Sequence, residues 1–491
     1  MTASTESHEP LTLDADAGVA LAERAYAAGL AVTRADGTRR AIPIATTPVV
    51  LDAAEHARRR RTTTRLVAAT AKVAHAVLDG PGRDAWLAAL RPVERRLVER
   101  TFTGLDRLAT ARVDYSVLPA GLAALEVNAT IPAMQGYSDI AAQAFIETAV
   151  AAAGGERETA RNLVAANGSN AEALRQALAA LHAAHASAAP LRTIALLARR
   201  GDAQSTELAF LSAHFERAGH EAAIVHPDEV VSAQPFIARG TTWQLVYRHL
   251  FASRLDEQPA PIVEEAFARW RDGPSLVVNP PAAHLEMKAT FARLSELAAD
   301  PRGARRAGLT DDELAAVRDT VPWTRRLRAG PSDLPEGAGT PDLVAAVAAD
   351  PARYVLKRSW SYGGVGVLVG SEAGTAAFRE RVLRLDPEAP LDWPALCARA
   401  AHAGGYVVQH AAPTEARRLA LHTPDTRVEG VMSVDYAAYA SLGVDVDAWG
   451  GVVRAAPSAI VNIVGGGGVV PLLRREVAEA LRRLRGEVRP E

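Results

Sequence analysis

One glycine-containing segment, Tyr354 to Gly370 (YVLKRSWSYGGVGVLVG), constrains the fold of this chain more than any other. An apolar run at 354–356 ends at Lys357, and a second run follows at 367–369, which predicts two strands joined by a turn. The glycines of the turn are Gly363, Gly364 and Gly366. Glycines let the backbone approach an anion and point N–H groups at it, and a lysine adds a mobile positive charge. The segment therefore predicts a hairpin suited to a triphosphate.

Two familiar phosphate-binding motifs do not fit this loop, and an ordinary hairpin is an alternative. A Walker A loop needs GxxxxGK[ST] running into a helix, and a Rossmann turn also precedes a helix, whereas strand-like residues follow the glycines here. Glycine-rich turns are common in hairpins that bind nothing. The nucleotide interpretation therefore depends on what else the chain contains.

The composition predicts a globular protein of several domains. The chain has 491 residues, enough for about three domains, and 48% of them are hydrophobic. A formal net charge of -2 gives no reason to expect binding to nucleic acid or membranes. The single cysteine, Cys397, excludes an internal disulfide framework and a cysteine-based zinc site. The polar start lacks the pattern of a signal peptide and no uncharged apolar stretch reaches membrane-spanning length, so we expect a soluble, cytoplasmic protein.

The pattern of apolar and polar residues changes at three points along the chain, which predicts four regions. Residues 1–110 have a helical pattern, 111–190 combine two strands with helices, and 191–285 contain a strand–helix–strand unit typical of a small parallel α/β domain. The turn of that unit lacks GxGxxG, so no dinucleotide site is predicted there. Residues 286–491 contain the glycine hairpin.

A candidate metal site lies on the second strand of the 111–190 region. This strand, 122–127, delivers Glu126 and Asn128, and residues two apart on a strand face the same side. A carboxylate and an amide oxygen so placed suit a Mg²⁺ ion that bridges nucleotide phosphates. The alternative is a strand-end turn in which Asn128 caps a helix.

Further polar residues stand at the ends of predicted elements. Arg248 ends a strand predicted at 241–248, where its guanidinium suits a substrate carboxylate, although a surface salt bridge is the commoner role of such a residue. Lys288 follows an Asn-Pro-Pro break and begins a helix directed toward a domain junction. The backbone after a buried strand, Gln409 to Ala412, is suited to hydrogen bonding with adenine.

Two more candidates and a second glycine run come late in the chain. Asp435 and Arg454 lie on predicted antiparallel strands, and Asp435 is expected to point inward. Gly465 to Gly468 form a glycine run placed where a mobile loop would close over a substrate.

The order of these motifs resembles the circularly permuted branch of the ATP-grasp superfamily, which includes eukaryotic-type glutathione synthetase and relatives of glutathionylspermidine synthetase. In the common ATP-grasp arrangement the acid-x-Asn strand comes last, whereas here it comes first. The resemblance covers about residues 110–470. The matching motifs are RVDY (112–115), LEVNATI (125–131), NPPAAHLEMK (279–288) and VLKRSWSYGG (355–364).

This resemblance implies an α/β (α+β) ATP-grasp fold, with a small parallel α/β substrate domain and an N-terminal helical region. It implies a ligase that phosphorylates a carboxylate with ATP and lets an amine attack the acyl phosphate. ATP and Mg²⁺ are then the cofactors, and a small acid and an amine are the substrates. By residue, it implies nucleotide contacts from Lys288, Lys357, Ser361, Gly363, Gly364, Gly366, Gln409, His410 and Ala411, metal ligands Glu126, Asn128 and Asp435, and charge neutralisation by Arg112, Arg248 and Arg454.

The chain also departs from the pattern of the family that it resembles. Glutathione synthetases carry a glutamate metal ligand four residues after the loop lysine, where this chain has Ser361, and they do not lead us to expect Trp360 or Tyr362. Either Asp435 substitutes for that ligand or fewer protein ligands hold the metal. Two alternatives therefore stay open: a regulatory or scaffold protein that binds a nucleotide without turnover, and a phosphoryl transferase. A homodimer is compatible with an enzyme of this size.

Overall fold

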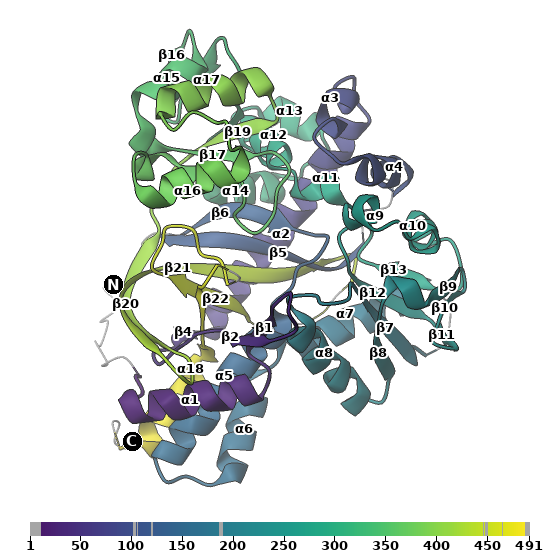
Figure 1. Ribbon diagram of the computed structural model, residues 1–491, viewed down its shortest axis with the longest axis vertical. Coiled ribbons are helices and arrows are strands. Elements are labelled where there is room, and N and C mark those ends of the chain that lie inside the picture. Colours follow the sequence, from purple (N-terminus) through teal and green to yellow (C-terminus); the bar gives the residue numbers. More distant parts are fainter. Residues whose placement is uncertain are drawn as a thin grey trace.

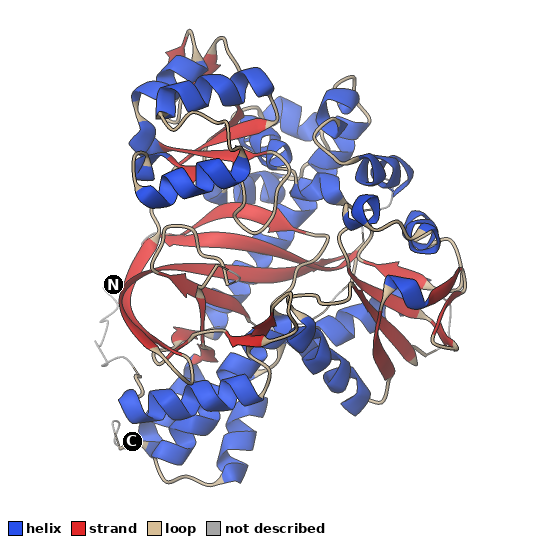
Figure 2. Cartoon of the chain, in the orientation of Figure 1, coloured by secondary structure: helices blue, strands red, loops and turns tan. Residues whose placement is uncertain are grey.

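The computed structural model describes residues 11–101, 105, 107–118, 121–185, 190–444, 446, 450–463 and 465–486. Helices and strands are interspersed along this part of the chain, which confirms the predicted mixture of helix and sheet. A seven-stranded sheet lies at the centre, with one four-stranded sheet above it and another at its side (Figure 1, Figure 2). Among the helices of the described residues, none is both long and apolar enough to cross a membrane.

The central sheet combines strands from both ends of the chain, in the order β20-β3-β23-β22-β21-β5-β6. Neighbouring strands are antiparallel, except that β23 pairs with β3 in parallel. One edge of the sheet is formed by β6. The strands are β3 (Ile44–Ala45), β5 (Leu108–Leu118), β6 (Gly121–Asn128), β20 (Glu415–His422), β21 (Arg427–Leu442), β22 (Gly451–Ala456) and β23 (Gly468–Val470).

Alternation along β5 separates an apolar face of this sheet from a polar one. Tyr115 faces the core beneath α2 (Ala53–Leu78), where its hydroxyl hydrogen bonds with Thr63 Oγ1 at 2.9 Å. Arg112 and Asp114 lie at the alternate positions and point to the other face. The candidate site is built on this second face.

Helices pack on both faces of the central sheet. On one side lies α2, and on the other lie α1 and α5, with α18 beside them. A break at Asn167 to Asn170 separates α6 from α7, as the sequence predicts. The bounds are α1 (Ala15–Ala27), α5 (Gln135–Ala152), α6 (Arg157–Asn167), α7 (Asn170–His185) and α18 (Arg475–Leu484).

The prediction of an entirely helical N-terminal region was wrong for residues 31–51. Four strands of two or three residues lie there, and they are too short for their alternation to be visible in the sequence. One of them enters the central sheet and another pairs with β24 (Leu472–Arg474), so each is stabilised by partners more than 400 residues away. The elements of this region are β1 (Ala31–Thr33), β2 (Arg39–Ala41), β3, β4 (Val49–Leu51), α3 (Arg83–Leu87) and α4 (Pro92–Thr101).

The sheet at the side is parallel, in the order β13-β12-β7-β8. Its first half is the predicted strand–helix–strand unit, because α8 connects β7 with β8. Such open sheets bind ligands at the carboxyl ends of their strands, where the connections diverge to opposite sides. The elements are β7 (Thr193–Ala198), α8 (Ser205–Arg217), β8 (Glu221–Val225), β12 (Leu245–His249), α9 (Arg254–Glu257), α10 (Pro261–Ala268) and β13 (Leu276–Val278).

The strand predicted at 241–248 is two strands in two sheets. Thr241–Trp243 (β11) joins a small antiparallel sheet with β9 (Val230–Ala233) and β10 (Phe236–Ala238), whereas β12 enters the parallel sheet. Gln244 lies between β11 and β12. Its side-chain oxygen accepts hydrogen bonds from the backbone N–H groups of residues 192 and 193, at the start of β7.

The upper sheet contains the glycine hairpin and has the order β14-β19-β17-β18, with every pairing antiparallel. The predicted hairpin is thereby confirmed. One face of the sheet is covered by α15, α16 and α17, and the other lies toward α12 and β6 (Figure 1). The elements are α11 (Ala283–Glu286), α12 (Lys288–Ala298), α13 (Pro301–Arg306), α14 (Asp311–Thr320), β14 (Thr324–Arg326), α15 (Leu343–Ala349), β17 (Tyr354–Arg358), β18 (Val367–Val369), α16 (Ala376–Leu385), α17 (Trp393–Ala403) and β19 (Tyr406–His410).

Leu356, at the middle of β17, is fully buried in the core of this upper sheet. We expect Leu356→Ala to lower the free energy of unfolding by about 2–5 kcal/mol, because it leaves a cavity between the strand and the covering helices. Urea denaturation followed by circular dichroism measures the change. Val365→Ala, at an exposed position of the same hairpin, is the control and is expected to cost less than about 0.5 kcal/mol. Equal losses would contradict this placement of β17.

Candidate functional site

Residues predicted on separate motifs meet where the edge strand β6 faces the glycine hairpin. The amino group of Lys357 donates to the Leu125 carbonyl at 3.0 Å and to Gln409 Oε1 at 2.7 Å. The amino group of Lys288 lies 3.3 Å from Glu126 Oε2. Two lysines from different elements therefore converge on the strand that carries Glu126.

Local structure explains why Lys288 reaches this place. It is the first residue of α12, and its backbone N–H donates to the Ser359 carbonyl at 2.8 Å. Its amino group donates to the Ser361 carbonyl at 2.5 Å, so the lysine holds the segment that enters the glycine turn. Ser361 itself hydrogen bonds through its hydroxyl to the Val365 carbonyl. Ser361 thus stabilises the turn, whereas a contact with metal or nucleotide stays a prediction.

Burial alters the acidity of Lys357. The residue is 7% exposed, and removal of its ammonium group from water lowers its pKa to about 8. Glu126 opposes this shift, and the neighbouring charge of Lys288 adds to it. An anion that approaches Lys357 would therefore stabilise the charged form of its amino group.

Glu126 and Asn128 lie on the polar face of the central sheet, opposite Asp114 and Arg112 in the pairing of β6 with β5. The Asn128 amide nitrogen is buried without a hydrogen-bond partner in the described structure. No group of three or more His, Cys, Asp or Glu residues that could hold a metal occurs within the described ranges. A carboxylate and an amide alone fit Mg²⁺, which commonly takes one or two protein ligands and completes its shell with phosphates and water.

Four charged residues form a continuous chain of hydrogen bonds beside these two. The Arg112 Nε donates to Asp114 Oδ1 at 2.7 Å, and Arg454 donates to Asp114 at 2.8 Å and to Asp435 at 2.5 and 3.0 Å. All four side chains are buried, with 3% to 8% of each residue exposed. The pairing register places them on the same face as Glu126. Arg112 and Arg454 thus lie on the same face as Glu126 with their charges already balanced, and a role in neutralising a substrate stays a prediction.

The two carboxylates of this network differ in acidity. Against the effect of burial, Arg112 and Arg454 lower the pKa of Asp114. Burial raises the pKa of Asp435, although Arg454 opposes the change. Both oxygens of Asp435 accept hydrogen bonds from Arg454, so its role as a metal ligand stays a prediction. Sequence reasoning missed Asp114, although the alternation of RVDY puts it on the same face as Arg112.

Arg248 has a different environment from the one predicted. It is 1% exposed, and its N–H groups donate to the backbone carbonyls of Leu250, Asn279, Pro280 and Thr130 at 2.7 to 3.2 Å. Burial lowers its pKa to about 10. These contacts position the chain that follows β6, β12 and β13, and direct contact with a substrate stays a prediction.

Glu286 is a second residue that sequence reasoning missed. Its carboxylate accepts hydrogen bonds from Ala129 N, Thr130 N and Thr130 Oγ1 at 2.6 to 2.7 Å. The turn that follows Asn128 is thereby fixed from α11. The only signal in the sequence is the position of Glu286 two residues before Lys288.

Two backbone donors of the predicted adenine-binding segment already have hydrogen-bond partners within the protein. The N–H groups of His410 and Ala411 donate to the carbonyls of Trp323 and Arg353, each at 2.8 Å. Gln409 bridges the two sides of the site, because its oxygen accepts from Lys357 and its nitrogen donates to Thr324 Oγ1 at 3.0 Å. Adenine recognition by this segment stays a prediction.

The glycine turn has a backbone conformation that favours glycine, and it contacts residues 460 and 462, just before the glycine run at 465–468. Gly363, Gly364 and Gly366 have φ angles of 63°, 74° and 82°, a region that side chains disfavour. Asn462 Nδ2 donates to the Gly363 carbonyl at 2.6 Å, and a Cβ added to Gly364 would lie 2.9 Å from the Ile460 side chain. The two segments therefore lie together over the site.

Trp360 and Tyr362, which the glutathione synthetase pattern does not lead us to expect, hold the glycine loop in place. Trp360 Nε1 donates to Glu94 Oε2 at 2.7 Å. The Tyr362 ring stacks on Phe251 with 4.2 Å between centroids, and its hydroxyl hydrogen bonds with Ser253 at 2.7 Å. Phe251 and Ser253 follow the carboxyl end of β12. The glycine turn is thus held against the carboxyl end of the parallel sheet.

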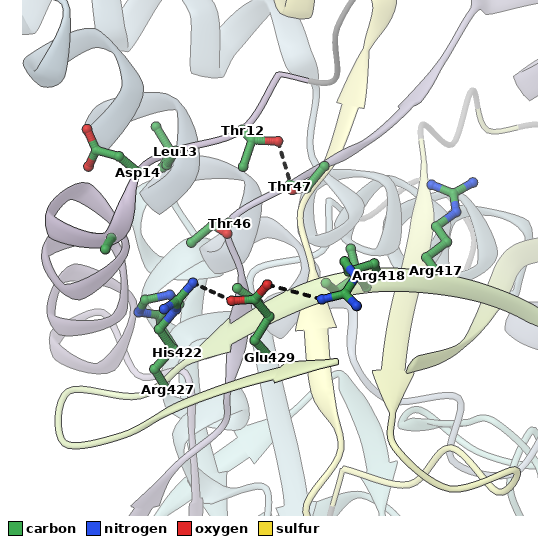
Figure 3. A pocket seen from close by; sticks show the side chains of 13 residues that line it. Thr12, Leu13, Asp14, Thr46, Thr47, Arg417, Arg418, His422, Arg427 and Glu429 are labelled. Atoms are coloured by element: carbon green, nitrogen blue, oxygen red, sulfur yellow. Dashed lines mark hydrogen bonds and ion pairs between the residues drawn. The ribbon is translucent and has the colours of Figure 1, made fainter. Parts of the chain in front are cut away.

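A separate cavity of about 540 Å³ lies between α1 and β20 (Figure 3), and no predicted site residue lines it. Glu429 forms ion pairs with both Arg418 and Arg427, at 3.5 and 2.5 Å. Thr12 and Thr47 hydrogen bond to each other at 3.0 Å across it. Because its charges are largely paired, this cavity is not a candidate for the chemistry predicted above.

The fold and the site define a class of protein in which a glycine hairpin of a small sheet closes against the edge of a larger one. One solved structure with a similar fold is a glutathione synthetase-like effector from Globodera pallida, with 11% identity, a TM-score of 0.55, and coverage of 94% of this chain and 96% of that one. The resemblance predicted from the sequence is therefore confirmed at the level of the fold.

Two further solved structures are too dissimilar to support a conclusion about the fold. A putative gamma-glutamylcysteine synthetase from Methylobacillus flagellatus has 12% identity, a TM-score of 0.37, and coverage of 86% of this chain and 89% of that one. The ATP-grasp ligase PsnB, in complex with a minimal precursor, has 12% identity, a TM-score of 0.27, and coverage of 61% and 99%. Both scores are too low to carry a conclusion. No family model matches the chain, and no curated protein matches it by sequence.

Removal of Arg454 tests the buried network. We expect Arg454→Met to lower the free energy of unfolding by about 3–5 kcal/mol, because it leaves two carboxylates buried with one arginine. The loss should be smaller at pH 5 than at pH 8. Arg454 opposes the effect of burial on Asp435, so in the variant the pKa of Asp435 should rise further above its unfolded value of 3.8. At pH 5 this carboxylate is then largely protonated and less unpaired charge stays buried, whereas at pH 8 the folded state must bury it as a charge. Urea denaturation at both pH values measures these changes.

The matched control is Arg417→Met on β20. Arg417 pairs with Glu415 at 2.6 Å, but the two side chains are 39% and 27% exposed. Such a pair contributes about 0–1 kcal/mol. A loss in Arg454→Met as small as in the control would show that the network is not buried in solution.

Proposed function

We propose that this chain is an ATP-dependent ligase that joins a carboxylate to an amine through an acyl phosphate and releases ADP and phosphate. The observation that carries the proposal is the convergence of Lys288 and Lys357 on Glu126 beneath the glycine hairpin. Phosphoryl transfer needs mainly positioning and neutralisation of spread negative charge, and these groups supply both.

The lysine content strengthens this assignment. The chain contains three lysines, Lys72, Lys288 and Lys357, and arginine supplies every other basic side chain apart from histidine. Two of the three therefore lie at this site. A lysine is a compact charge on a flexible stem, whereas an arginine is a rigid fork, so the two are not interchangeable next to a phosphate.

The other residues take roles that follow from their places. Glu126 and Asn128 would hold Mg²⁺, which would neutralise phosphate charge. Lys357 would exchange its contacts with Leu125 and Gln409 for phosphate oxygens. The glycine turn would offer N–H groups and exclude water, which the acyl phosphate requires.

We also propose the permuted ATP-grasp arrangement, because the strand with Glu126 precedes the hairpin in the chain and yet lies against it. The division into residues 1–110, 111–190, 191–285 and 286–491 stays a prediction. Phe251, which follows the carboxyl end of β12, stacks on Tyr362, and we infer that the acid and amine bind between this end of the parallel sheet and the glycine turn.

A second candidate is a nucleotide-binding protein without turnover. It is favoured by one observation, the pairing of Asp435 with Arg454, which together with Ser361 leaves Glu126 and Asn128 as the protein ligands for a metal. This candidate binds ATP but releases no ADP in response to acids and amines.

Turnover distinguishes these candidates. We expect ADP release from MgATP in pools of amino acids, small peptides and polyamines to require both an acid and an amine. Lys357→Ala should reduce it by at least about tenfold, because it removes a charge that stabilises the transferring phosphoryl group. The control is Lys72→Ala, since Lys72 pairs with Glu313 on α2 and α14, away from the site.

Two outcomes would contradict the proposal. Equal activity of the two lysine variants would remove Lys357 from the mechanism. Binding of ATP without ADP release in any pool would favour the regulatory alternative.

The pKa of Lys357 predicts a pH dependence of ATP binding. We expect the affinity to fall as the pH rises through about 8, approaching tenfold per pH unit, because the lysine attracts phosphate only while protonated. Burial lowers the pKa of the neighbouring His410 below 6.5, so this histidine stays neutral throughout. Isothermal titration calorimetry from pH 7 to 9 measures the effect. Lys357→Ala should bind more weakly and without this dependence, and a flat profile in the unmodified protein would contradict the assignment.

A further inference from the structure

A second cleft, of about 940 Å³, lies on the outer side of the glycine loop. Its walls come from α3, α4, the start of α12 and the ends of β14, β17 and β19. Four arginines line it, and we call it the arginine cleft: Arg91, Arg326, Arg328 and Arg358. None of the proposed ligands of nucleotide or metal lines it except Ser361, so it is a different site.

The charge of this cleft is not balanced from within. No Asp or Glu is among its lining residues, although the whole chain has 57 acidic and 55 basic side chains. Within the described ranges, no ion pair involves Arg326, Arg328 or Arg358, and Arg91 lies 3.7 Å from Glu257. In the cavity of Figure 3, by contrast, Arg418 and Arg427 share one glutamate. The arginine cleft therefore attracts anions, whereas the other cavity is largely neutralised.

Aromatic side chains complete the walls. Trp86, Trp360 and Tyr406 line the cleft, and the Arg326 guanidinium lies 5.5 Å from the centre of the Trp86 ring. Trp86 is 8% exposed, and its indole N–H is buried with no acceptor in the described structure. Flat rings stack on planar groups, and an unpaired buried donor is costly unless an acceptor reaches it. These features suit a ligand with both a ring and acceptor oxygens.

We propose that the arginine cleft binds a small organic polyanion, a molecule with a planar or apolar body and at least two phosphate or carboxylate groups. Guanidinium forks bind both kinds of oxygen, and arginines next to aromatic rings favour planar anions. The volume is that of a small-molecule site. Residues 358–362 line this cleft, and the same segment accepts hydrogen bonds from Lys288 through Ser359 and Ser361. The ligand would thus contact the segment that enters the glycine turn.

Pyrenetetrasulfonate, a fluorescent planar tetraanion, is the probe that tests this. We expect the protein to bind it, as measured by fluorescence anisotropy, and Arg326→Ala/Arg328→Ala to raise its Kd by at least about tenfold, because two charge-assisted contacts are lost. Both arginines are exposed, so the variant should fold, and Arg358→Ala is a second variant with the same expected direction. The matched control is Arg417→Ala/Arg418→Ala in the cavity of Figure 3, which should leave the Kd unchanged.

In the direct binding measurement, three outcomes would overturn the proposal: an unchanged Kd in Arg326→Ala/Arg328→Ala, an equal loss in the control, or an equal loss in Lys357→Ala, which would place the probe in the nucleotide site. Because Lys357→Ala should keep probe binding, failure of the proposed ligase function leaves this test intact. In the Lys357→Ala protein, inorganic triphosphate and the peptide Glu-Trp-Glu then compete with the probe. Displacement by triphosphate assigns phosphate groups to the natural ligand, displacement by the peptide assigns carboxylates, and displacement by neither overturns the proposal.

Discussion

The contact between the Lys357 amino group and the edge strand β6 is the interaction on which the candidate site depends. An edge strand leaves backbone carbonyls unpaired, and the Leu125 carbonyl is satisfied here by a lysine from another sheet. The buried ammonium group is costly unless acceptors surround it. Because Leu125 and Glu126 of β6 and Gln409 of β19 supply that environment, the lysine joins the upper sheet to the central one and stays charged near neutral pH.

Around this contact, the polar groups are arranged in two layers. Lys288, Lys357, Glu126 and Asn128 form the layer nearest the hairpin. The two lysines carry charges that a phosphate would complement, and Glu126 carries one that a metal would complement. Behind it, arginines and aspartates neutralise one another within the polar face of the central sheet. The second layer keeps β5, β21 and β22 in register, while the first retains unbalanced groups that a ligand can use.

The glycine hairpin contacts several other parts of the molecule, which a freely mobile lid would not do. Its aromatic residues reach α4 and the end of β12, its start is held by Lys288, and its tip touches the late glycine-rich segment through Asn462. The arginine cleft lies on its outer side. Occupants of the nucleotide site, the substrate region and the cleft would therefore all meet one short stretch of backbone.

Local patterns in the sequence determined the hairpin, the parallel unit and the strand with Glu126, because alternation and glycine turns depend on neighbouring residues alone. Tertiary structure decided the rest. The short strands at 31–51 depend on partners hundreds of residues away, and Arg248 and Asp435 depend on which acceptors or donors surround them once buried. The roles of Glu286 and the arginine cleft could not be predicted from the sequence, because a charge acquires its role from the groups that folding brings within hydrogen-bonding distance. For Asp114, the alternation in RVDY indicates the face of the strand but not the two arginines that neutralise it.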